Sequence, residues 1–391
     1  MGAGLNQVVH NQEGAKPPMA TNLFQVASKI HKFSEAHYQN RLSNVYDYIL
    51  KFWKLTEHDL TMAPFDLEEC FTLLEQQLRE SIDNQDNSKE RLLGDISFKF
   101  VSFLAELLSD FELSVYDSEE LKKLGKMIYS QRSTVITFNY DCLIEAAIEI
   151  ASGVTEDIPV EFISPKSATF TREVSNDELP YSHFNWNRPL GYGVKFDRVQ
   201  LHRAGISDYV DGERFYSHPR NELYPWHILK LHGSLNWFRY LPFKSFKPAS
   251  SENDASFEEL KNEVVLVEGH WWFTSPPELD GWYIYPLIVT PTLYKQDYFR
   301  DPIYNRVLAP MWQEASESLI DCDKLVVIGY SFPPTDFQTK KLFLEAFSNS
   351  SVEELFVVNP NTSVVQKVKE LCHFHKPISV CRDLGELLQI S

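Results

Sequence analysis

Apolar residues spaced three and four positions apart dominate the chain between Thr21 and Ser130. Stretches such as NVYDYILKFWKL and DLEECFTLLEQQLRESI repeat this spacing over several turns, which is typical of amphipathic helices. Asp66 stands just before the second stretch, where its carboxylate can accept hydrogen bonds from the first free amides of a helix. We therefore predict a mostly helical subdomain over about residues 27–130, with Asp66 as a helix N-cap.

Beyond residue 133 the pattern changes to short, continuous apolar runs. The first run, Thr134 to Phe138, is β-branched and leads through the turn-like triplet Asn139-Tyr140-Asp141 into a helical pattern. Strand, loop and helix in this order form half of a βαβ unit. Further runs of the same kind are ILKLHGS, YPLIVTP, DKLVVIGYS, EELFVVNP and PISVCRD. Short apolar runs that alternate with helices indicate a parallel sheet covered on both faces.

The predicted fold class is therefore α/β: a Rossmann-like parallel sheet with helices on both faces, plus a helical layer and an inserted segment. The insertion is expected over about residues 154–226, because this stretch is long, aromatic and polar by turns, and interrupts the strand–helix rhythm. A length of 391 residues suits two average domains or one large α/β domain with insertions. We expect a single domain over residues 1–391.

Composition and charge narrow the possible functions. Hydrophobic residues make up 43% of the chain and aromatic residues 14%, which argues against disorder of the whole chain. The formal net charge of −18 repels phosphate backbones, so we expect no direct nucleic-acid partner. No apolar run approaches the ~20 residues that span a bilayer, and the N-terminus lacks the basic-then-apolar design of a signal peptide. We expect a cytoplasmic protein without a membrane partner.

The cysteines also favour a cytoplasmic protein. Cys70, Cys142, Cys322, Cys372 and Cys381 are scattered along the chain and form no Cys-x-x-Cys pair. This spacing argues against a disulfide framework and against a zinc ribbon. Reduced thiols in a cytosolic protein are the simplest interpretation, and we expect no metal site.

Small and polar residues follow most of the predicted strands. In doubly wound sheets, ligands bind beyond the carboxyl ends of the strands, so these residues form the candidate site. Glycine there allows the backbone to approach a ligand closely, and small or hydroxyl-bearing residues offer donors to phosphate and ribose. The residues are Asn139-Tyr140-Asp141, His232-Gly233-Ser234, Thr290-Pro291-Thr292, Gly329-Tyr330-Ser331 and Asn359-Pro360-Asn361. Gly2-Ala3-Gly4 is a candidate phosphate turn for the same crevice.

Each of these motifs also has an ordinary structural interpretation. A bare Gly-Ala-Gly is common, a single histidine is more often structural than catalytic, and Asn139 is a usual turn residue. Asp141 would then cap the helix that begins near Cys142, and Ser331 would be a turn donor ahead of Pro333. The ordered set, with its members at the ends of apolar strands, is what favours a nucleotide site.

The motifs GAG, FNYD, LHGS, GYS and VVNP occur in this order along the chain, and they resemble the successive NAD-pocket motifs of the sirtuin family. The segments VITFNYDCLIE, LKLHGSLNW and VVIGYSFPPTD are most similar to the sirtuin-like NADases of bacterial anti-phage defence. The resemblance is densest from Thr134 to Asn361 and implies NAD as the substrate, with Asn139 and His232 as catalytic residues. The cofactor-binding residues that it implies are Gly2, Ala3, Gly4, Asp141, Gly233, Ser234, Gly329, Tyr330, Ser331 and Asn359.

Three features depart from the protein deacetylases among the sirtuins. There is no pair of Cys-x-x-Cys motifs, KPPMATNLF stands where Pro-Asp-Phe-Arg would follow the GAG loop, and GAG is followed by Leu5-Asn6. These features lower the expectation of peptide deacetylation and leave NAD cleavage. A phosphate turn should also follow a β-strand, whereas only Met1 stands before Gly2 in the printed sequence.

The residues suit cleavage of the bond between nicotinamide and ribose. Nicotinamide leaves through an oxocarbenium-like state, and because it already carries positive charge it needs no general acid. Asn139 would orient the attacking water or the ribose hydroxyls, and His232 would be the general base, since an imidazole pKa near ~6.5 suits that role. Asp141 would accept from the nicotinamide amide. Gly329 and Ser331 would hold phosphate or ribose, and Asn359 the adenosine ribose.

The expected function is therefore an NAD glycohydrolase that depletes NAD in anti-phage defence, with nicotinamide and ADP-ribose as products. Unregulated loss of NAD would kill the host, so we expect control by assembly or by a partner. The resemblance implies homo-oligomers and, for some relatives, a ring-forming ATPase of the HerA type acting in trans. The alternatives are a non-catalytic sensor of NAD or ADP-ribose, a structural scaffold, and peptide deacetylation.

Overall fold

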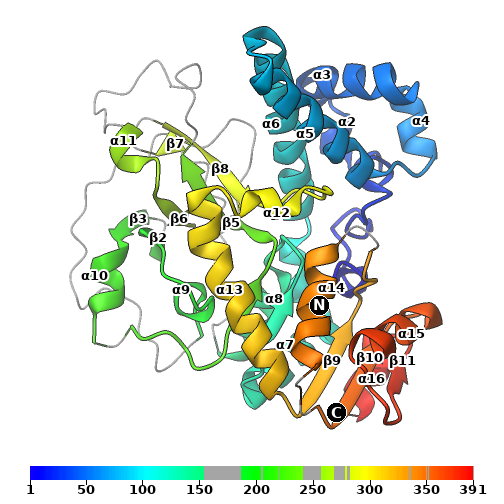
Figure 1. Cartoon of the computed structure of the whole chain (residues 1–391), viewed down its shortest axis with the longest axis vertical. Helices are drawn as coiled ribbons and strands as arrows, with labels where there is room; N and C mark the ends of the chain where they lie inside the picture. The colour runs from blue at the N-terminus through cyan, green and yellow to red at the C-terminus, as the bar shows by residue number, and fades with distance from the viewer. Residues whose placement is uncertain are drawn as a thin grey trace.

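The structure is a computed structural model of the chain. Figure 1 shows a helical region at the top, a mixed sheet on the left and a small parallel sheet at the lower right. The mixed α/β class and the helical N-terminal region predicted from the sequence are confirmed. The structure describes residues 1–153, 186–203, 206–219, 221–240, 257–267, 278–279, 282–333, 336–348, 350 and 352–390.

The N-terminal third is a succession of helices. Asp66 is the N-cap of its helix as predicted, because its side chain accepts from the amides of Glu68 and Glu69. The apolar positions of that helix fall on one buried stripe, as in other amphipathic helices. The elements are η1 (Leu5–Val8), α1 (Leu23–Ala27), α2 (His31–Ser34), α3 (Ala36–Trp53), α4 (Glu57–Met62), α5 (Leu67–Asp83), α6 (Asn87–Ser109), η2 (Glu112–Asp117) and α7 (Glu119–Gln131).

Five of the predicted strands are present, in two separate parallel sheets. β1 (Val135–Thr137) pairs with β4 (Ile228–Lys230). β10 (Glu354–Val358) pairs with β9 (Lys324–Ile328) on one side and β11 (Ser379–Cys381) on the other. The associated helices are α8 (Leu143–Ala151), α13 (Pro302–Asp321), α14 (Phe337–Phe347), α15 (Thr362–Leu371) and α16 (Leu384–Ile390).

The first residues of the chain lie between these two sheets. The Met1 amino group donates to the carbonyl of Ile136 at 2.6 Å, and the Phe138 amide donates back to the Met1 carbonyl at 3.1 Å. On the other side, the Gly2 amide donates to the carbonyl of Ile328 at 3.0 Å. Met1 and Gly2 therefore connect the edge of β1 to the edge of β9.

A larger mixed sheet has the strand order β3-β2-β6-β5-β8-β7. The run Tyr285 to Pro291, predicted as a strand of the parallel sheet, falls largely in β8, which pairs antiparallel with β5. That prediction was wrong because a strand buried on both faces carries the same continuous apolar run in either orientation. The strands are β2 (Arg198–Arg203), β3 (Ile206–Asp211), β5 (Gly233–Tyr240), β6 (Val264–Leu266), β7 (Glu278–Leu279) and β8 (Trp282–Ile288).

Both faces of the mixed sheet are buried, each against a different core. Trp237 and Val264 belong to the core of the α/β part, whereas their neighbours Phe238 and Val265 belong to the core of the helical region. Successive residues of a strand point to opposite faces. The helical region therefore covers one face of this sheet, and its position explains a part of the chain that the family resemblance left unassigned.

The sequence ILKLHGSLNWF spans two strands that belong to different sheets. β4 ends at Lys230, a turn contains His232, and β5 begins at Gly233 in the mixed sheet. Gly233 has a φ of +82°, and a Cβ at this position would lie 2.1 Å from the carbonyl oxygen of Leu287. Glycine therefore allows the chain to change sheets at this point, and His232 lies at the junction.

Only part of the predicted insertion over residues 154–226 can be described, since residues 154–185 lie outside the described ranges. The rest contains α9 (Arg188–Gly191), the antiparallel pair of β2 and β3, and α10 (Gly212–Ser217). β2 also pairs with β6, so the pair of β2 and β3 is built into the mixed sheet. In the described part of the chain, no helix is long and apolar enough to cross a membrane.

Candidate functional site

Two glycine turns pack backbone against backbone where β9 ends. The Gly4 amide donates to the carbonyl of Gly329 at 3.0 Å. Gly329 has a φ of +62°, and a Cβ there would lie 2.3 Å from the Leu5 nitrogen. A Cβ at Gly2 would lie 2.7 Å from the Tyr330 ring. Side chains at these positions would force the turns apart, so the structure brings the GAG and GYS motifs together through their glycines.

The amides of these turns are already used within the protein. Gly2 donates to Ile328 and Gly4 donates to Gly329, so neither amide is a free donor for a phosphate. Sequence reasoning assigned Gly2 and Gly4 to cofactor binding. The structure gives them a different visible role, which is the close approach of the two turns.

Asn6 joins the chain start to the FNYD motif. The Asn139 Nδ2 donates to the Asn6 Oδ1 at 3.1 Å, and the Asn6 Nδ2 donates to the Asp141 Oδ2 at 2.6 Å. Asp141 also accepts from the Leu143 amide at 3.2 Å, two residues on, just before α8, whose N-cap is Cys142. Burial raises the pKa of Asp141, while the nearby Lys230 ammonium acts in the opposite direction. Both Asp141 oxygens are thus engaged in positioning the loop that carries Asn139.

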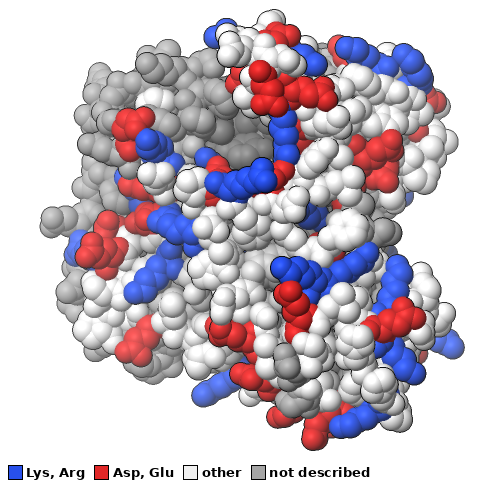
Figure 2. Space-filling view, viewed as in Figure 1, with Lys and Arg blue, Asp and Glu red and all other residues white. Residues whose placement is uncertain are grey.

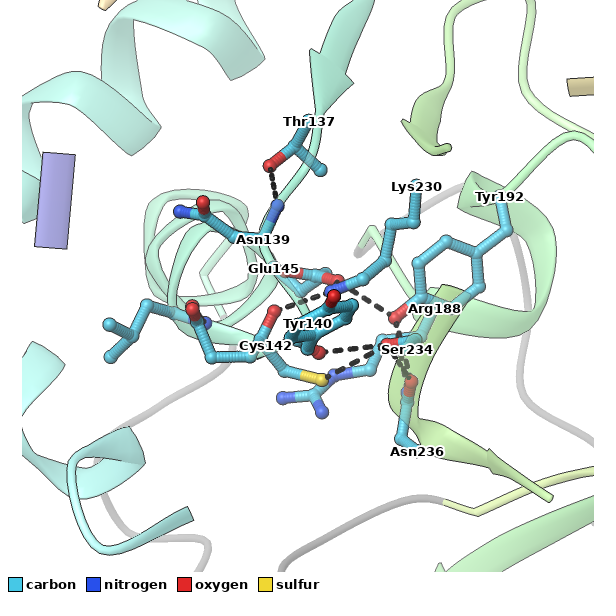
Figure 3. Close-up of polar contacts among 12 residues, drawn as sticks. Thr137, Asn139, Tyr140, Cys142, Glu145, Arg188, Tyr192, Lys230, Ser234 and Asn236 are labelled. Carbon is cyan, nitrogen blue, oxygen red and sulfur yellow. Dashed lines mark hydrogen bonds and ion pairs between the residues drawn. The ribbon is translucent and has the colours of Figure 1, made fainter. Parts of the chain in front are cut away.

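A fully buried ion pair holds the backbone of the loop that carries Asn139. Lys230 and Glu145 have no exposed side-chain surface, and the Lys230 Nζ lies 2.8 Å from the Glu145 Oε1. The same ammonium donates to the backbone carbonyl of Asp141. In Figure 3 the Asn139 side chain points away from this pair. Lys230 therefore fixes the backbone of the FNYD turn, while Asn139 is presented on the other side.

Ser234 belongs to the same buried polar network. Its hydroxyl donates to the Asn236 Oδ1 at 2.6 Å and lies 3.4 Å from the carbonyl of Tyr140 (Figure 3). Asn236 in turn donates to the hydroxyl of Tyr192 at 3.0 Å. Ser234 was predicted to bind cofactor. The structure places its side chain in this network, with no exposed surface.

His232 lies beside two charged residues that sequence reasoning did not select. The His232 Nε2 is 3.5 Å from the Asp336 Oδ2, and the Lys295 Nζ is also 3.5 Å from that oxygen. All three side chains are buried, and the His232 Nε2 accepts no hydrogen bond within the described residues. The imidazole, the carboxylate and the ammonium therefore form a compact charged group at the junction of the two sheets.

Burial decides the protonation state of this group. It lowers the pKa of His232 to about 4, with Lys295 acting in the same direction and Asp336 opposing it. Burial alone would raise the pKa of Asp336, but His232, Lys295 and the hydroxyl of Tyr330 outweigh it and hold that pKa below its usual value. At neutral pH, Asp336 is ionised and His232 is neutral. The expectation of an ordinary imidazole pKa was wrong, because sequence alone does not reveal desolvation.

Aromatic rings link the two halves of the site. Phe138 stacks on Tyr330 with ring centroids 4.2 Å apart, and it contacts the His232 ring at 5.3 Å. The Tyr330 hydroxyl donates to Asp336. The Tyr140 hydroxyl donates to the carbonyl of Val289 at 2.6 Å. The FNYD, LHGS and GYS motifs are therefore in contact, with Phe138 at their centre.

Ser331 and Asn359 lie at the ends of β9 and β10 but outside this group of contacts. Ser331 is exposed, and its carbonyl accepts from Lys367 at 3.5 Å. The Asn359 side chain accepts from the amide of Asn361 at 2.9 Å, as in an ordinary Asx turn. The adjacency of the two strand ends is as predicted, since the Gly329 amide donates to the carbonyl of Val358.

The helical region reaches the site through α5. Glu68 lies 3.8 Å from the ammonium of Lys295. Two turns further along, Glu75 accepts from the hydroxyls of Thr290 and Tyr298 at 2.6 and 2.7 Å. These contacts join α5 to the segment that follows β8, which includes α12 (Lys295–Tyr298). α5 therefore borders the charged group around His232.

Within the described ranges, neither surface charge nor a cluster of metal ligands points to a further ligand of the site. On the face shown in Figure 2, basic and acidic side chains of the described residues are interspersed. Across the described residues, no group of three or more His, Cys, Asp or Glu side chains is placed to hold a metal ion.

Sequence reasoning missed four residues that the structure places in the site. Asn6 follows the GAG motif directly, and Asp336 lies at the end of the GYSFPPTD stretch, so both were adjacent to selected motifs. Lys295 and Glu68 carry no local signal, because they lie on helices far apart in the sequence. Only the packing of α5 against the end of β8 brings them to His232.

Comparison with family models and curated proteins identifies no relative, so any assignment of function rests on the site. No protein-family model matches the chain, and no curated protein matches it.

Proposed function

We propose that the chain is an NAD glycohydrolase that releases nicotinamide and ADP-ribose. The observation that carries this proposal is the contact of motifs that are far apart in sequence. His232 and Tyr330 lie on Phe138, the residue next to Asn139, and the GAG turn packs on Gly329. The motifs that resemble the NAD pocket of sirtuin-like NADases are thus neighbours in space as well as ordered in sequence.

We further propose that the two parallel sheets are parts of one Rossmann-like sheet, with Met1 and Gly2 between β1 and β9. The chain then proceeds outward from β1 to β4 on one side and from β9 to β11 on the other. Ligands bind where the strand order reverses in this way. Asn139 and Tyr330 follow the two strands that border this point.

In the proposed reaction, Asn139 orients the water or the ribose hydroxyls. Its amide plane is fixed by Asn6, which is held in turn by Asp141. An amide has two donor hydrogens and an acceptor oxygen, so Asn139 keeps capacity for substrate after donating once to Asn6. We assign Asn6 and Asp141 as positioning residues, because each acts through Asn139.

His232 takes the proton from the attacking water. Its Nε2 is free of hydrogen bonds within the described residues and neutral at pH 7, which is the form that accepts a proton. Asp336, 3.5 Å away, stabilises the imidazolium that results. Phe138 and Tyr330 supply an apolar wall, and exclusion of water strengthens these electrostatic interactions.

The biological setting is proposed from the family resemblance. We propose a role in anti-phage defence, with NAD as substrate, a homo-oligomeric assembly, and control by a partner such as a HerA-type ATPase. Size measurement of the purified chain, with and without such a partner, tests the assembly. A chain that is monomeric under all these conditions would contradict it.

The decisive experiment measures nicotinamide release from NAD by the wild type, Asn139→Ala and His232→Ala. Each change should lower the rate by about 100-fold or more. Matched controls are Asn40→Ala on α3 and His58→Ala on α4, both exposed, and these should keep the wild-type rate. Wild-type protein that releases no nicotinamide, alone or with candidate partners, would contradict the proposal.

One observation favours a second candidate, a non-catalytic sensor of NAD or ADP-ribose. A pKa of about 4 makes His232 a weak base at neutral pH, and general bases work best with a pKa near the working pH. The sensor predicts NAD binding by calorimetry without nicotinamide release. It also predicts that His232→Ala changes the affinity for NAD by no more than a few-fold.

A further inference from the structure

Met1 and Gly2 have the hydrogen bonds of a strand that pairs with two neighbours at once. In a parallel ladder, one residue donates to the partner strand and accepts from a residue two positions further along that strand. Met1 does this with Ile136 and Phe138, which aligns it with Thr137. Gly2 donates to Ile328, which aligns Met1 with Ile328. Residues 1 and 2 therefore have the geometry of the end of a central parallel strand.

The residues that precede this point in β1 and β9 also face each other, and some of their backbone amides point toward the opposite strand. The Val135 amide donates to the carbonyl of His227, just before β4, and the Gly329 amide donates to that of Val358 in β10. Alternate residues direct their amides to opposite edges, so the amides of Ile136, Val326 and Ile328 point into the space between the two sheets. Two parallel edges thus face each other across the space in which Met1 and Gly2 bond to both strands.

A cleft of about 390 Å³ occupies this space. Its side walls are β1 and β9, and its two faces are closed by helices. Leu124 and Ile128 of α7 lie on one face, and Leu319 of α13 and Phe343 of α14 also line it. A central strand of a parallel sheet has this environment, with edges on both sides and apolar helices on both faces.

The amino group of Met1 is poorly suited to the end of this cleft. Burial lowers its pKa to about 5, because an ammonium loses its hydration there. An amide nitrogen would make the same hydrogen bond to Ile136 without a charge. The electrostatics of the cleft therefore favour a peptide bond at this position.

We propose that the cleft binds an extended segment joined to the Met1 nitrogen, which forms a parallel strand between β1 and β9. Lys324 to Val327 precede Ile328 in β9, so a segment of about four residues before Met1 would pair along the whole of β9. The segment would be continuously apolar, since both its faces are covered. The edges of β1 and β9 determine the direction and the register of this strand.

The completed sheet explains the separation of the two parallel pieces. Its spatial order would be β4, β1, the new strand, β9, β10 and β11. Numbered along the chain, this is the order 3-2-1-4-5-6 of dinucleotide-binding folds. The new strand would lead directly into Gly2-Ala3-Gly4, so the glycine turn would follow the first strand as such turns do.

The test compares three extended proteins, each with its own initiating methionine followed by four residues placed before Met1. One extension is Ile-Val-Ile-Val. The second, Ile-Pro-Ile-Pro, keeps length and apolar character but removes the amides at the two positions that face β9. The third is Ser-Gly-Ser-Gly. Hydrogen exchange of the segments 134–138 and 324–329, followed by mass spectrometry, and the thermal midpoint are measured for each and for the unextended chain.

The Ile-Val extension should slow exchange in both segments by about tenfold or more, because it both supplies acceptors to the Ile136, Val326 and Ile328 amides and donates its own amides to β9, which the Ile-Pro extension cannot do. It should also raise the thermal midpoint by a few degrees. The Ile-Pro and Ser-Gly extensions should do neither. Equal protection by the Ile-Pro extension, or no protection by the Ile-Val extension, would overturn the proposal.

Two further measurements distinguish aggregation of the Ile-Val protein and binding of a separate peptide from the proposed strand. A Val-Thr-Val-Thr extension, which is less apolar and equally β-prone, serves if the Ile-Val protein aggregates, and it should give the same protection. An acetylated Ile-Val-Ile-Val peptide added to the unextended chain tests a strand supplied by a partner. Equal protection by the free peptide would overturn the covalent attachment. These measurements need no NAD turnover, so their failure is distinct from failure of the proposed NADase activity.

Discussion

The Asn6 side chain donates to Asp141 at 2.6 Å, and both residues are about 5% exposed. The bond ties the turn at the start of the chain to the turn that follows β1. Because Asn6 also accepts from Asn139, one small amide orients the proposed catalytic asparagine.

The first prediction concerns this link. Asn6→Ala leaves the buried Asp141 Oδ2 without its donor and releases Asn139. We expect a loss of about 1–3 kcal/mol in the free energy of unfolding and a fall in nicotinamide release. Urea denaturation and the release assay measure the two effects. The exposed change Asn40→Ala should alter neither, and unchanged activity in Asn6→Ala would show that Asn139 needs no such support.

The second prediction concerns the buried ion pair. Lys230→Met leaves Glu145 without its cationic partner and with no exposed surface, which should cost about 3–5 kcal/mol in the free energy of unfolding. The double change Lys230→Met with Glu145→Leu should recover much of this loss, because no buried charge remains. Denaturant unfolding of the three proteins measures both effects.

The exposed pair of Lys341 and Glu345, 3.7 Å apart on α14, is the matched control. Lys341→Met should change the free energy of unfolding by less than about 1 kcal/mol. A similar loss for Lys341→Met and Lys230→Met would contradict the importance of burial.

The third prediction uses the pH dependence of stability. Unfolded His232 binds a proton near its ordinary pKa of 6.5, whereas in the folded protein burial lowers that pKa to about 4. The unfolded state therefore binds more protons between these values, and stability falls as the pH drops from 6.5 to 4. This group alone accounts for about 3 kcal/mol. His232→Gln should lack that part of the decline in urea titrations at pH 7 and pH 4.5, whereas His58→Gln should retain it.

The fourth prediction concerns the pH dependence of the reaction. A base with a pKa of about 4 is already deprotonated at pH 5.5, so nicotinamide release should vary little between pH 5.5 and 8. Burial is the main cause of the low pKa, and Lys295 adds to it. Lys295→Met should therefore shift the acid limb of kcat/KM to higher pH. An acid limb centred near 6.5 in the wild type would show that His232 is not desolvated during the reaction.

The fifth prediction concerns the contact of the glycine turns. Gly329→Ala places a Cβ 2.3 Å from the Leu5 nitrogen at a φ of +62°, so the two turns must separate. We expect a loss of about 1–3 kcal/mol in stability and loss of activity. Gly94→Ala on α6, where an added Cβ meets no atom within 4 Å, should instead stabilise the helix by about 0.5–1 kcal/mol. Thermal unfolding of both variants separates strain at the site from a general effect of alanine.

The site was predictable where its residues follow strands. Asn139 and His232 could be selected because the carboxyl ends of neighbouring parallel strands meet at one edge of a sheet. Asp336 could be noted only as a neighbour of the GYS motif, and Lys295 carried no local signal, because α12 comes to Asp336 and His232 only through tertiary packing. The pKa of His232 was equally out of reach, since it depends on burial by residues from several elements.

From the sequence alone we could predict the helices of the first third, the cap at Asp66 and the strands β1, β4, β9, β10 and β11. These features follow from hydrophobic periodicity and from single residues that satisfy local backbone groups. The sequence did not reveal the direction of β8, the change of sheet at Gly233 or the cleft between β1 and β9. Strand pairing and desolvation depend on contacts between distant segments, and a local pattern of apolar residues is the same whichever neighbour a strand finally meets.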